Sequence, residues 1–91
     1  MTGKSRSSGD QSKLIASILN DALATGDTVA FVKAIGDLLR VQGMTNVSQK
    51  TGLNRSTLYI SFRGSMMPNI DRVIRALAAL DLEVIVRPIR S

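Results

Sequence analysis

Glycines and helix-capping residues divide most of this chain into short segments, each with the apolar spacing of an α-helix. Gly26 and Asp27 separate the first two segments, and Gly43, Gly52 and Asn54 mark the next boundaries. Glycine readily takes the positive φ that closes a helix, whereas Asp and Asn favour the position that begins one. The chain has 91 residues, of which 44% are hydrophobic, enough for one small core. We therefore predict a single all-α domain of short, packed helices.

The apolar residues locate five helices between residues 12 and 80. Ser12 is a suitable cap for the first helix, Thr45 for the third and Asn69 for the last. The predicted helices are Lys13 to Ala24, Thr28 to Gln42, Thr45 to Thr51, Asn54 to Phe62, and the segment from Asn69 through Leu80.

The same spacing predicts which side chains are buried. The first helix has two apolar rows, Leu14, Ile18, Ala22 and Ile15, Leu19, Leu23; the second buries Phe31, Ala34, Ile35, Leu38 and Leu39; the last buries Ile70, Val73, Ile74 and Leu77. Gly36 lies inside the second helix, where it costs about 1 kcal/mol relative to Ala. We therefore expect close helix packing at Gly36.

The two ends of the chain differ from its middle. Residues 1–11 are small, polar and rich in Gly and Ser, so we predict a flexible basic tail before a domain at residues 12–91. Asp81 follows the last helix where Gly is usual, which predicts a helix end that is slightly strained or differently closed. Leu82 to Arg87 is β-branched and alternating, and we predict one short C-terminal strand. A lone strand needs a second copy of the chain, another edge or a partner protein, and we predict that it pairs across a two-fold axis as a dimerisation strand.

Composition and charge limit the function. The chain has no Cys and no His, which removes the usual metal ligands, thiolate nucleophiles and imidazole bases. We expect no catalytic site, no metal or other cofactor, and no enzyme activity. No apolar run is long enough to span a membrane, and the first ten residues do not resemble a secretory signal, so we expect a cytoplasmic protein. The net charge of +5 favours polyanionic partners.

The positive charge has an informative distribution along the sequence. No acidic residue falls between Leu38 and Ile70, whereas four basic residues do, so this window carries +4: Arg40, Lys50, Arg55 and Arg63. The window contains Met44 to Phe62, where Val47, Leu53, Leu58 and Phe62 would hold two short helices together at the Gly52 turn, with the small Ser48 at their crossing. This spacing is typical of a helix-turn-helix, in which the second helix enters the major groove of DNA.

The helix from Asn54 to Phe62 would then present side chains suited to base edges. Arg55 can bond guanine through two atoms, Ser56 can bond any base, and Tyr59 can reach phosphate or a thymine methyl group. Lys50 lies on the preceding helix, which crosses the DNA backbone. The full set of predicted DNA-binding residues is Thr45, Asn46, Lys50, Asn54, Arg55, Ser56, Tyr59 and Arg63.

About seventy residues resemble the probable addiction module antidote proteins. The resemblance is carried by LNDALATGD from Leu19, by AIGDLLRVQGMTNVSQKTGLNRSTLY from Ala34 and by PNIDRVIRALAALDL from Pro68. The family usually has Gln at position 46, Ala at 48, Glu at 56 and Gly at 81; the missing acid at Ser56 favours DNA contact. The resemblance implies a lambda-repressor-like fold and an antitoxin encoded beside a small toxin similar to the RelE-type ribosome-dependent ribonucleases.

Taken together, we predict a homodimeric type II antitoxin that binds a RelE-like toxin and represses its own operon at a near-palindromic, double-stranded DNA operator. The alternative is a stand-alone Cro/repressor-type transcriptional regulator without a toxin. A module that binds only the toxin would show no salt-dependent affinity for DNA.

Overall fold

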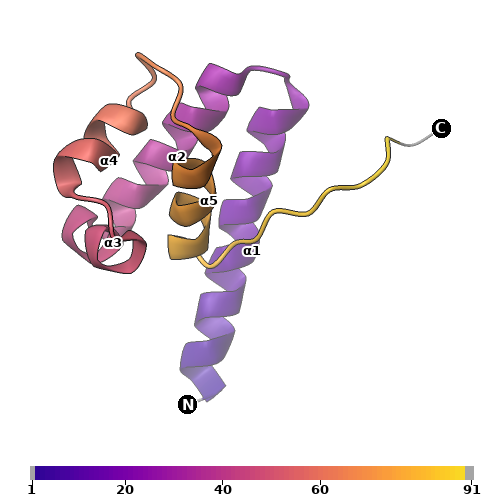
Figure 1. Ribbon diagram of the computed structural model, residues 1–91. Coiled ribbons are helices and arrows are strands. Elements are labelled where there is room, and N and C mark those ends of the chain that lie inside the picture. Colours follow the sequence, from indigo (N-terminus) through magenta and orange to yellow (C-terminus); the bar gives the residue numbers. More distant parts are fainter. Residues whose placement is uncertain (1, 90–91) are drawn as a thin grey trace.

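In the computed structural model, which describes residues 2–89, the chain forms five helices and no strand within that range (Figure 1). The prediction of an all-α domain is confirmed. The helices are α1 (Thr2–Ala24), α2 (Thr28–Gln42), α3 (Met44–Thr51), α4 (Arg55–Ser61) and α5 (Ile70–Ala79).

The predicted caps account for most of the helix boundaries. The Asp27 carboxylate accepts a hydrogen bond from the Ala30 backbone N–H, and the carboxamide oxygens of Asn54 and Asn69 cap α4 and α5 in the same way. Gly43 closes α2 with φ 99°. The predicted cap at Thr45 is wrong, because α3 already begins at Met44 directly after Gly43.

The core lies where all five helices meet, with α2 contributing its central strip. Its members are Leu19 of α1, Val32, Ile35 and Leu39 of α2, Met44 and Val47 of α3, Leu58 and Phe62 of α4 and its end, and Ala76, Leu77, Ala79 and Leu80 of α5 and its end. The predicted close contact at Gly36 is confirmed, because a Cβ built there would clash with the Phe62 carbonyl oxygen and lie 3.1 Å from the Phe62 Cβ.

Helix α1 begins earlier than the sequence suggested. It starts at Thr2 rather than Lys13, so residues 2–11, predicted as a flexible tail, belong to the helix, whereas Met1 lies outside the described residues. Extending an existing helix fixes one residue per added hydrogen bond and needs no new nucleus, so polar residues can continue it. Figure 1 shows this end of α1 projecting beyond the other helices.

Several apolar residues predicted to be buried are exposed instead. On α1, Leu19 is buried, whereas Leu14, Ile18 and Leu23 are 64%, 43% and 51% exposed. On α5, Ile70 and Ile74 are exposed, because the face against the core carries Val73, Ala76, Leu77 and Leu80. An apolar stripe wider than the available contact leaves its margin in solvent.

The predicted strand from Leu82 to Arg87 is also not observed. Among residues 2–89 no strand is assigned; this segment first passes along α1 and α5 and then runs away from the helices (Figure 1). The reason is that the rest of the described chain is helical and offers no edge to pair with. The strained helix end is confirmed, because Asp81 has a φ of 63°. Among the described residues with positive φ, Asp81 alone is not a glycine.

Candidate nucleic-acid interface

Helices α3 and α4 are joined by a turn whose conformation is determined by residues within the turn itself. Gly52 has φ 76° and ψ 6°, and its backbone N–H donates to the Ser48 carbonyl oxygen at 3.0 Å. The Ser48 hydroxyl donates in turn to the Leu53 carbonyl oxygen at 2.6 Å. The turn predicted at Gly52 is confirmed, and the small polar Ser48 holds α3 to the chain that enters α4.

A second hydroxyl tightens the same turn from the buried side. Thr51 is 6% exposed, and its hydroxyl donates to the Val47 carbonyl oxygen at 2.9 Å while accepting from the Leu53 backbone N–H at 3.1 Å. A buried hydroxyl that is both donor and acceptor leaves no unsatisfied polar group. The Thr51 hydroxyl therefore joins the last turn of α3 to the chain that leads into α4.

Apolar contacts then fix the inner faces of α3 and α4 against the core. Val47, Leu58 and Phe62 are each at most 1% exposed, and Leu53 is partly buried against them. All four were predicted to hold this helix pair together. Met44, Thr51 and Ser61 are buried on the same inner faces, whereas the side chains on the opposite faces of the two helices are exposed.

Helix α5 contacts both α3 and α4 through two arginine side chains. The Arg75 guanidinium donates to the Thr51 carbonyl oxygen at 3.0 Å and forms an ion pair with Asp71 at 2.9 Å. Arg72 donates to the hydroxyl of Ser61, a buried residue of α4, at 3.3 Å. Sequence reasoning did not assign these two arginines a role; their spacing of three on one helix was the available signal.

All eight predicted DNA-binding residues are exposed: Thr45, Asn46, Lys50, Asn54, Arg55, Ser56, Tyr59 and Arg63. The structure brings two of them together across the helix pair, because the Arg55 guanidinium lies 3.4 Å from the Thr45 hydroxyl. Asn54 has a structural role as well, since its side-chain oxygen accepts from the Thr57 backbone N–H at 2.8 Å.

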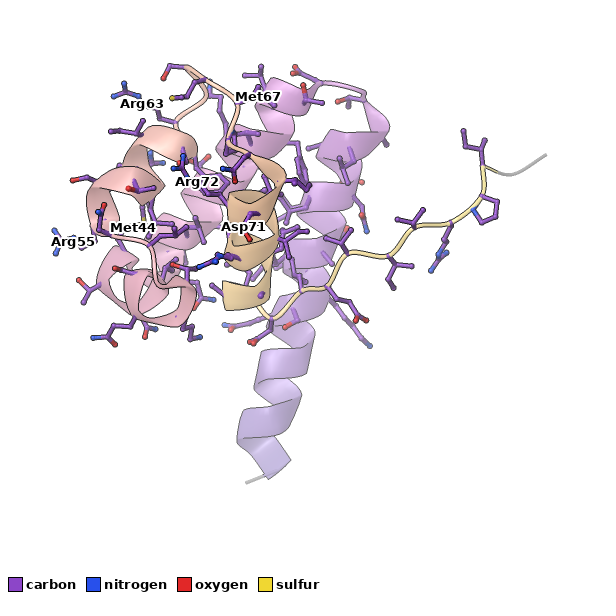
Figure 2. The ribbon with its side chains drawn as sticks, viewed as in Figure 1. Met44, Arg55, Arg63, Met67, Asp71 and Arg72 are labelled. Atoms are coloured by element: carbon purple, nitrogen blue, oxygen red, sulfur yellow. The ribbon has the colours of Figure 1, made fainter. Side chains whose placement is uncertain are left out.

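Arg63 does not join the others. It follows Phe62 beyond the C-terminal end of α4 and donates to the Ser65 hydroxyl at 2.9 Å. Figure 2 shows Arg55 and Arg63 at opposite ends of α4. The exposed surface of α3 and the start of α4 is therefore the compact part of the predicted site, with Arg63 at its edge.

One residue from outside the predicted set also reaches this surface. The Arg40 guanidinium of α2 lies 6.0 Å from the centre of the Tyr59 ring, at the limit of a cation–π contact, and is paired with Asp37 at 2.9 Å. In the sequence, the sign that Arg40 belongs to this surface was its position in the acid-free window between Leu38 and Ile70. The ion pair with Asp37 offsets part of its charge, so Lys50, Arg55 and Arg63 carry most of the positive charge of this surface.

The exposed groups of this surface are polar or positively charged. No group of three or more potential metal-ligating His, Cys, Asp or Glu side chains occurs in the part of the chain that the structure describes. No helix within residues 2–89 is long and apolar enough to cross a membrane. Exposed hydroxyl, amide, guanidinium and ammonium groups, without an acid among them, can donate hydrogen bonds to phosphates and base edges.

Comparison with known proteins gives a family for this arrangement. Residues 5–88 match the family described as "Probable addiction module antidote protein". An uncharacterized protein of Haemophilus influenzae is 28% identical over 65 residues, which cover 71% of this chain and 67% of that protein. No solved structure matches the chain significantly.

Proposed function

The chain belongs to the family of probable addiction module antidote proteins, and from this premise we propose that it is an antitoxin that also represses its own operon. In this proposal α3, the Gly52 turn and α4 form the helix-turn-helix of a lambda-repressor-like domain. The protein acts in the cytoplasm as a homodimer on a near-palindromic operator, and its second partner is a RelE-like toxin.

The observation that carries the DNA-binding part is the contrast between the two faces of α3 and α4. Their inner residues are buried in the core, whereas the residues predicted to read DNA are all exposed and include no acid. An acidic side chain on a groove-facing surface would repel phosphates, so its absence over both helices favours polyanion binding.

Arg55 and Lys50 have different roles in this proposal. Arg55 is the first residue of α4, where the side chains of a groove-reading helix meet base edges, and a two-atom contact with guanine contributes about 1 to 3 kcal/mol of discrimination. Lys50 is in the last turn of α3, where it contacts a phosphate and therefore carries no sequence preference.

The test measures binding of the wild type, Arg55→Ala and Lys50→Ala to the protein's own upstream DNA and to a scrambled duplex at several salt concentrations. Arg55→Ala should lose about 5- to 150-fold in affinity for the operator and much less for scrambled DNA. Lys50→Ala should weaken both and lower the salt slope by about one unit.

Lys13→Ala is the matched control, because Lys13 is exposed on α1 and its loss removes the same charge. It should leave the salt slope unchanged. If Arg55→Ala weakens both duplexes equally, Arg55 contacts phosphate only. If the wild type does not distinguish the two duplexes, the repressor function is wrong.

The toxin is tested separately, because family membership rather than any described contact supports it. Co-expression with a small toxin encoded beside this gene should relieve growth arrest and give a complex that copurifies. An adjacent toxin that stays active with this protein in excess would leave a stand-alone Cro/repressor-type regulator as the function.

A further inference from the structure

The C-terminal arm, residues 82–89, is an extended segment whose backbone groups beyond Leu82 have no hydrogen-bond partner among the residues that the structure describes. Its one backbone hydrogen bond joins the Leu82 N–H to the Leu77 carbonyl oxygen at 2.9 Å and anchors the arm to the end of α5. Beyond Leu82 the apolar side chains of the arm are exposed, with Val86 at 91% and Ile89 at 94%, and beyond Ile85 the arm runs away from the helices (Figure 1).

The composition of the arm favours pairing with another strand. Val84, Ile85 and Val86 are β-branched, which restricts them toward extended backbone, and no proline interrupts them before Pro88. An exposed extended segment with free N–H and C=O groups is a template for strand addition. Figure 1 shows the arm leaving the bundle on the side away from α3 and α4, so a partner there would not cover the proposed DNA-binding surface.

We propose that the partner of the arm is the arm of a second copy of this chain, paired antiparallel about a two-fold axis at Ile85. This inference rests on the homodimer of the proposed function and specifies which residues of the two chains pair. When a two-fold axis perpendicular to an antiparallel strand pair relates the two chains, the residue numbers of every opposing pair add up to the same even number. One residue therefore lies opposite its own copy, and the axis passes between these two.

The charges of the arm select Ile85 as that position. With the axis at Ile85, Glu83 lies opposite Arg87 of the partner subunit, and the same pair recurs on the other side of the axis. Opposite charges directly across an antiparallel pair are stabilising, and like charges are destabilising. On the other face of the pair, Val84 then meets Val86 of the partner subunit.

Neighbouring registers lose this complementarity. An axis at Val86 would place Glu83 opposite Ile89 of the partner subunit and Arg87 opposite Ile85. An axis at Val84 would place Glu83 opposite Ile85 and Arg87 opposite Asp81, but Asp81 has φ 63° and lies outside the extended segment. Only the register at Ile85 pairs both charged residues of the arm.

The beginning of the arm already lies on an apolar surface that a second copy can extend. Residues 82–85 line a groove together with Leu19 and Leu23 of α1 and with Ile70 and Leu77 of α5. Ile70 is 70% and Leu23 is 51% exposed in the single chain. A paired arm brings more apolar side chains to this groove, so burial of the groove adds to the stability of the dimer.

The experiment is sedimentation equilibrium of the full chain without DNA or toxin, comparing the wild type, Glu83→Arg, Arg87→Glu and the double charge swap. Each single variant sets two like-charged pairs across the axis, and the dimer dissociation constant should rise about tenfold or more. The double swap restores opposite charges and should return the constant to within about threefold of the wild type. The differences should shrink at 1 M salt.

Lys13→Glu on α1 is the control for a charge change of the same size, and it should leave dimerisation unchanged. Glu83 and Arg87 are exposed and outside the core, so all variants should keep the wild-type helix content by circular dichroism. A wild type that stays monomeric at about 100 μM, or single variants that dimerise normally, or a double swap without rescue, would each overturn the proposal.

These outcomes are separable from failure of the proposed function. A monomer whose arm is protected only in a complex with the toxin would overturn self-pairing and leave the antitoxin function intact. A dimer with charge-swap rescue that does not bind its upstream DNA would keep the pairing and overturn the repressor function.

Discussion

Gly36→Ala tests whether the fold of α2 is coupled to the position of α4. In an ordinary exposed helix this substitution stabilises by about 1 kcal/mol, because Ala has the higher helix propensity. Gly36 is buried here, and its φ does not require glycine. Propensity alone therefore predicts that the alanine variant is more stable than the wild type.

The structure predicts the opposite sign. A Cβ on residue 36 would clash with the Phe62 carbonyl oxygen and lie 3.1 Å from the Phe62 Cβ. The first of these atoms is backbone and Phe62 is 1% exposed, so neither can rotate out of the way. Overpacking of this kind costs about 1 to 3 kcal/mol. Taking the upper half of that range and subtracting the propensity gain leaves a net loss of about 1 to 2 kcal/mol.

Thermal unfolding followed by circular dichroism measures the effect. In a domain of this size, 1 kcal/mol corresponds to about 4 to 8 °C in Tm, so Gly36→Ala should lower Tm by about 5 to 15 °C. Val41→Ala is the matched control, because Val41 is on the same helix and 86% exposed, and its replacement should raise Tm slightly. An increase in Tm for Gly36→Ala would refute the close approach of α2 to the end of α4.

Three further substitutions probe the supports of the same site, each measured by urea or thermal unfolding. Asn54→Ala removes the acceptor of the Thr57 N–H and should cost about 1 kcal/mol, whereas Asn54→Asp should retain most of the stability. Arg75→Ala removes a donor from the Thr51 carbonyl oxygen; because Arg75 is half exposed, the loss should be about 1 kcal/mol, and Arg75→Lys should recover little. Asp81→Gly relieves a positive φ and should raise stability by about 0.5 to 1 kcal/mol; an unchanged or lower stability would mean that Asp81 is not strained.

Local signals in the sequence predicted the parts of the fold that depend on local chemistry. Asp27, Asn54 and Asn69 each cap a helix where expected, because the capping hydrogen bond spans only three residues and is independent of the rest of the chain. Gly36 predicted a close contact through its cost in a helix, although its partner, Phe62, could not be identified from the sequence. The outward position of Arg55 followed from the apolar spacing of its neighbours.

The wrong predictions concern features that depend on contacts between distant segments of the chain. Ile70 and Ile74 have the same apolar character as Leu77, and only the packing of α5 on the other helices places them at the margin of the core. The strand at residues 82–87 was predicted from β-branched residues, but its formation requires a second edge that the described chain lacks. Neither the register of α5 nor the presence of an edge is encoded within a few residues.

The supports of α4 have a consequence for interpreting any variant of the DNA-binding surface. Helix α4 has seven residues, too few for an isolated helix to be stable in water, so its position depends on tertiary contacts. Those contacts come from α2 through Gly36 and from α5 through Arg72, which donates to Ser61. Changes at these supports should therefore lower stability and DNA affinity together, whereas Arg55→Ala on the exposed face should lower affinity at constant stability. Measuring unfolding and binding on the same variants thus separates residues that contact DNA from residues that position the helix.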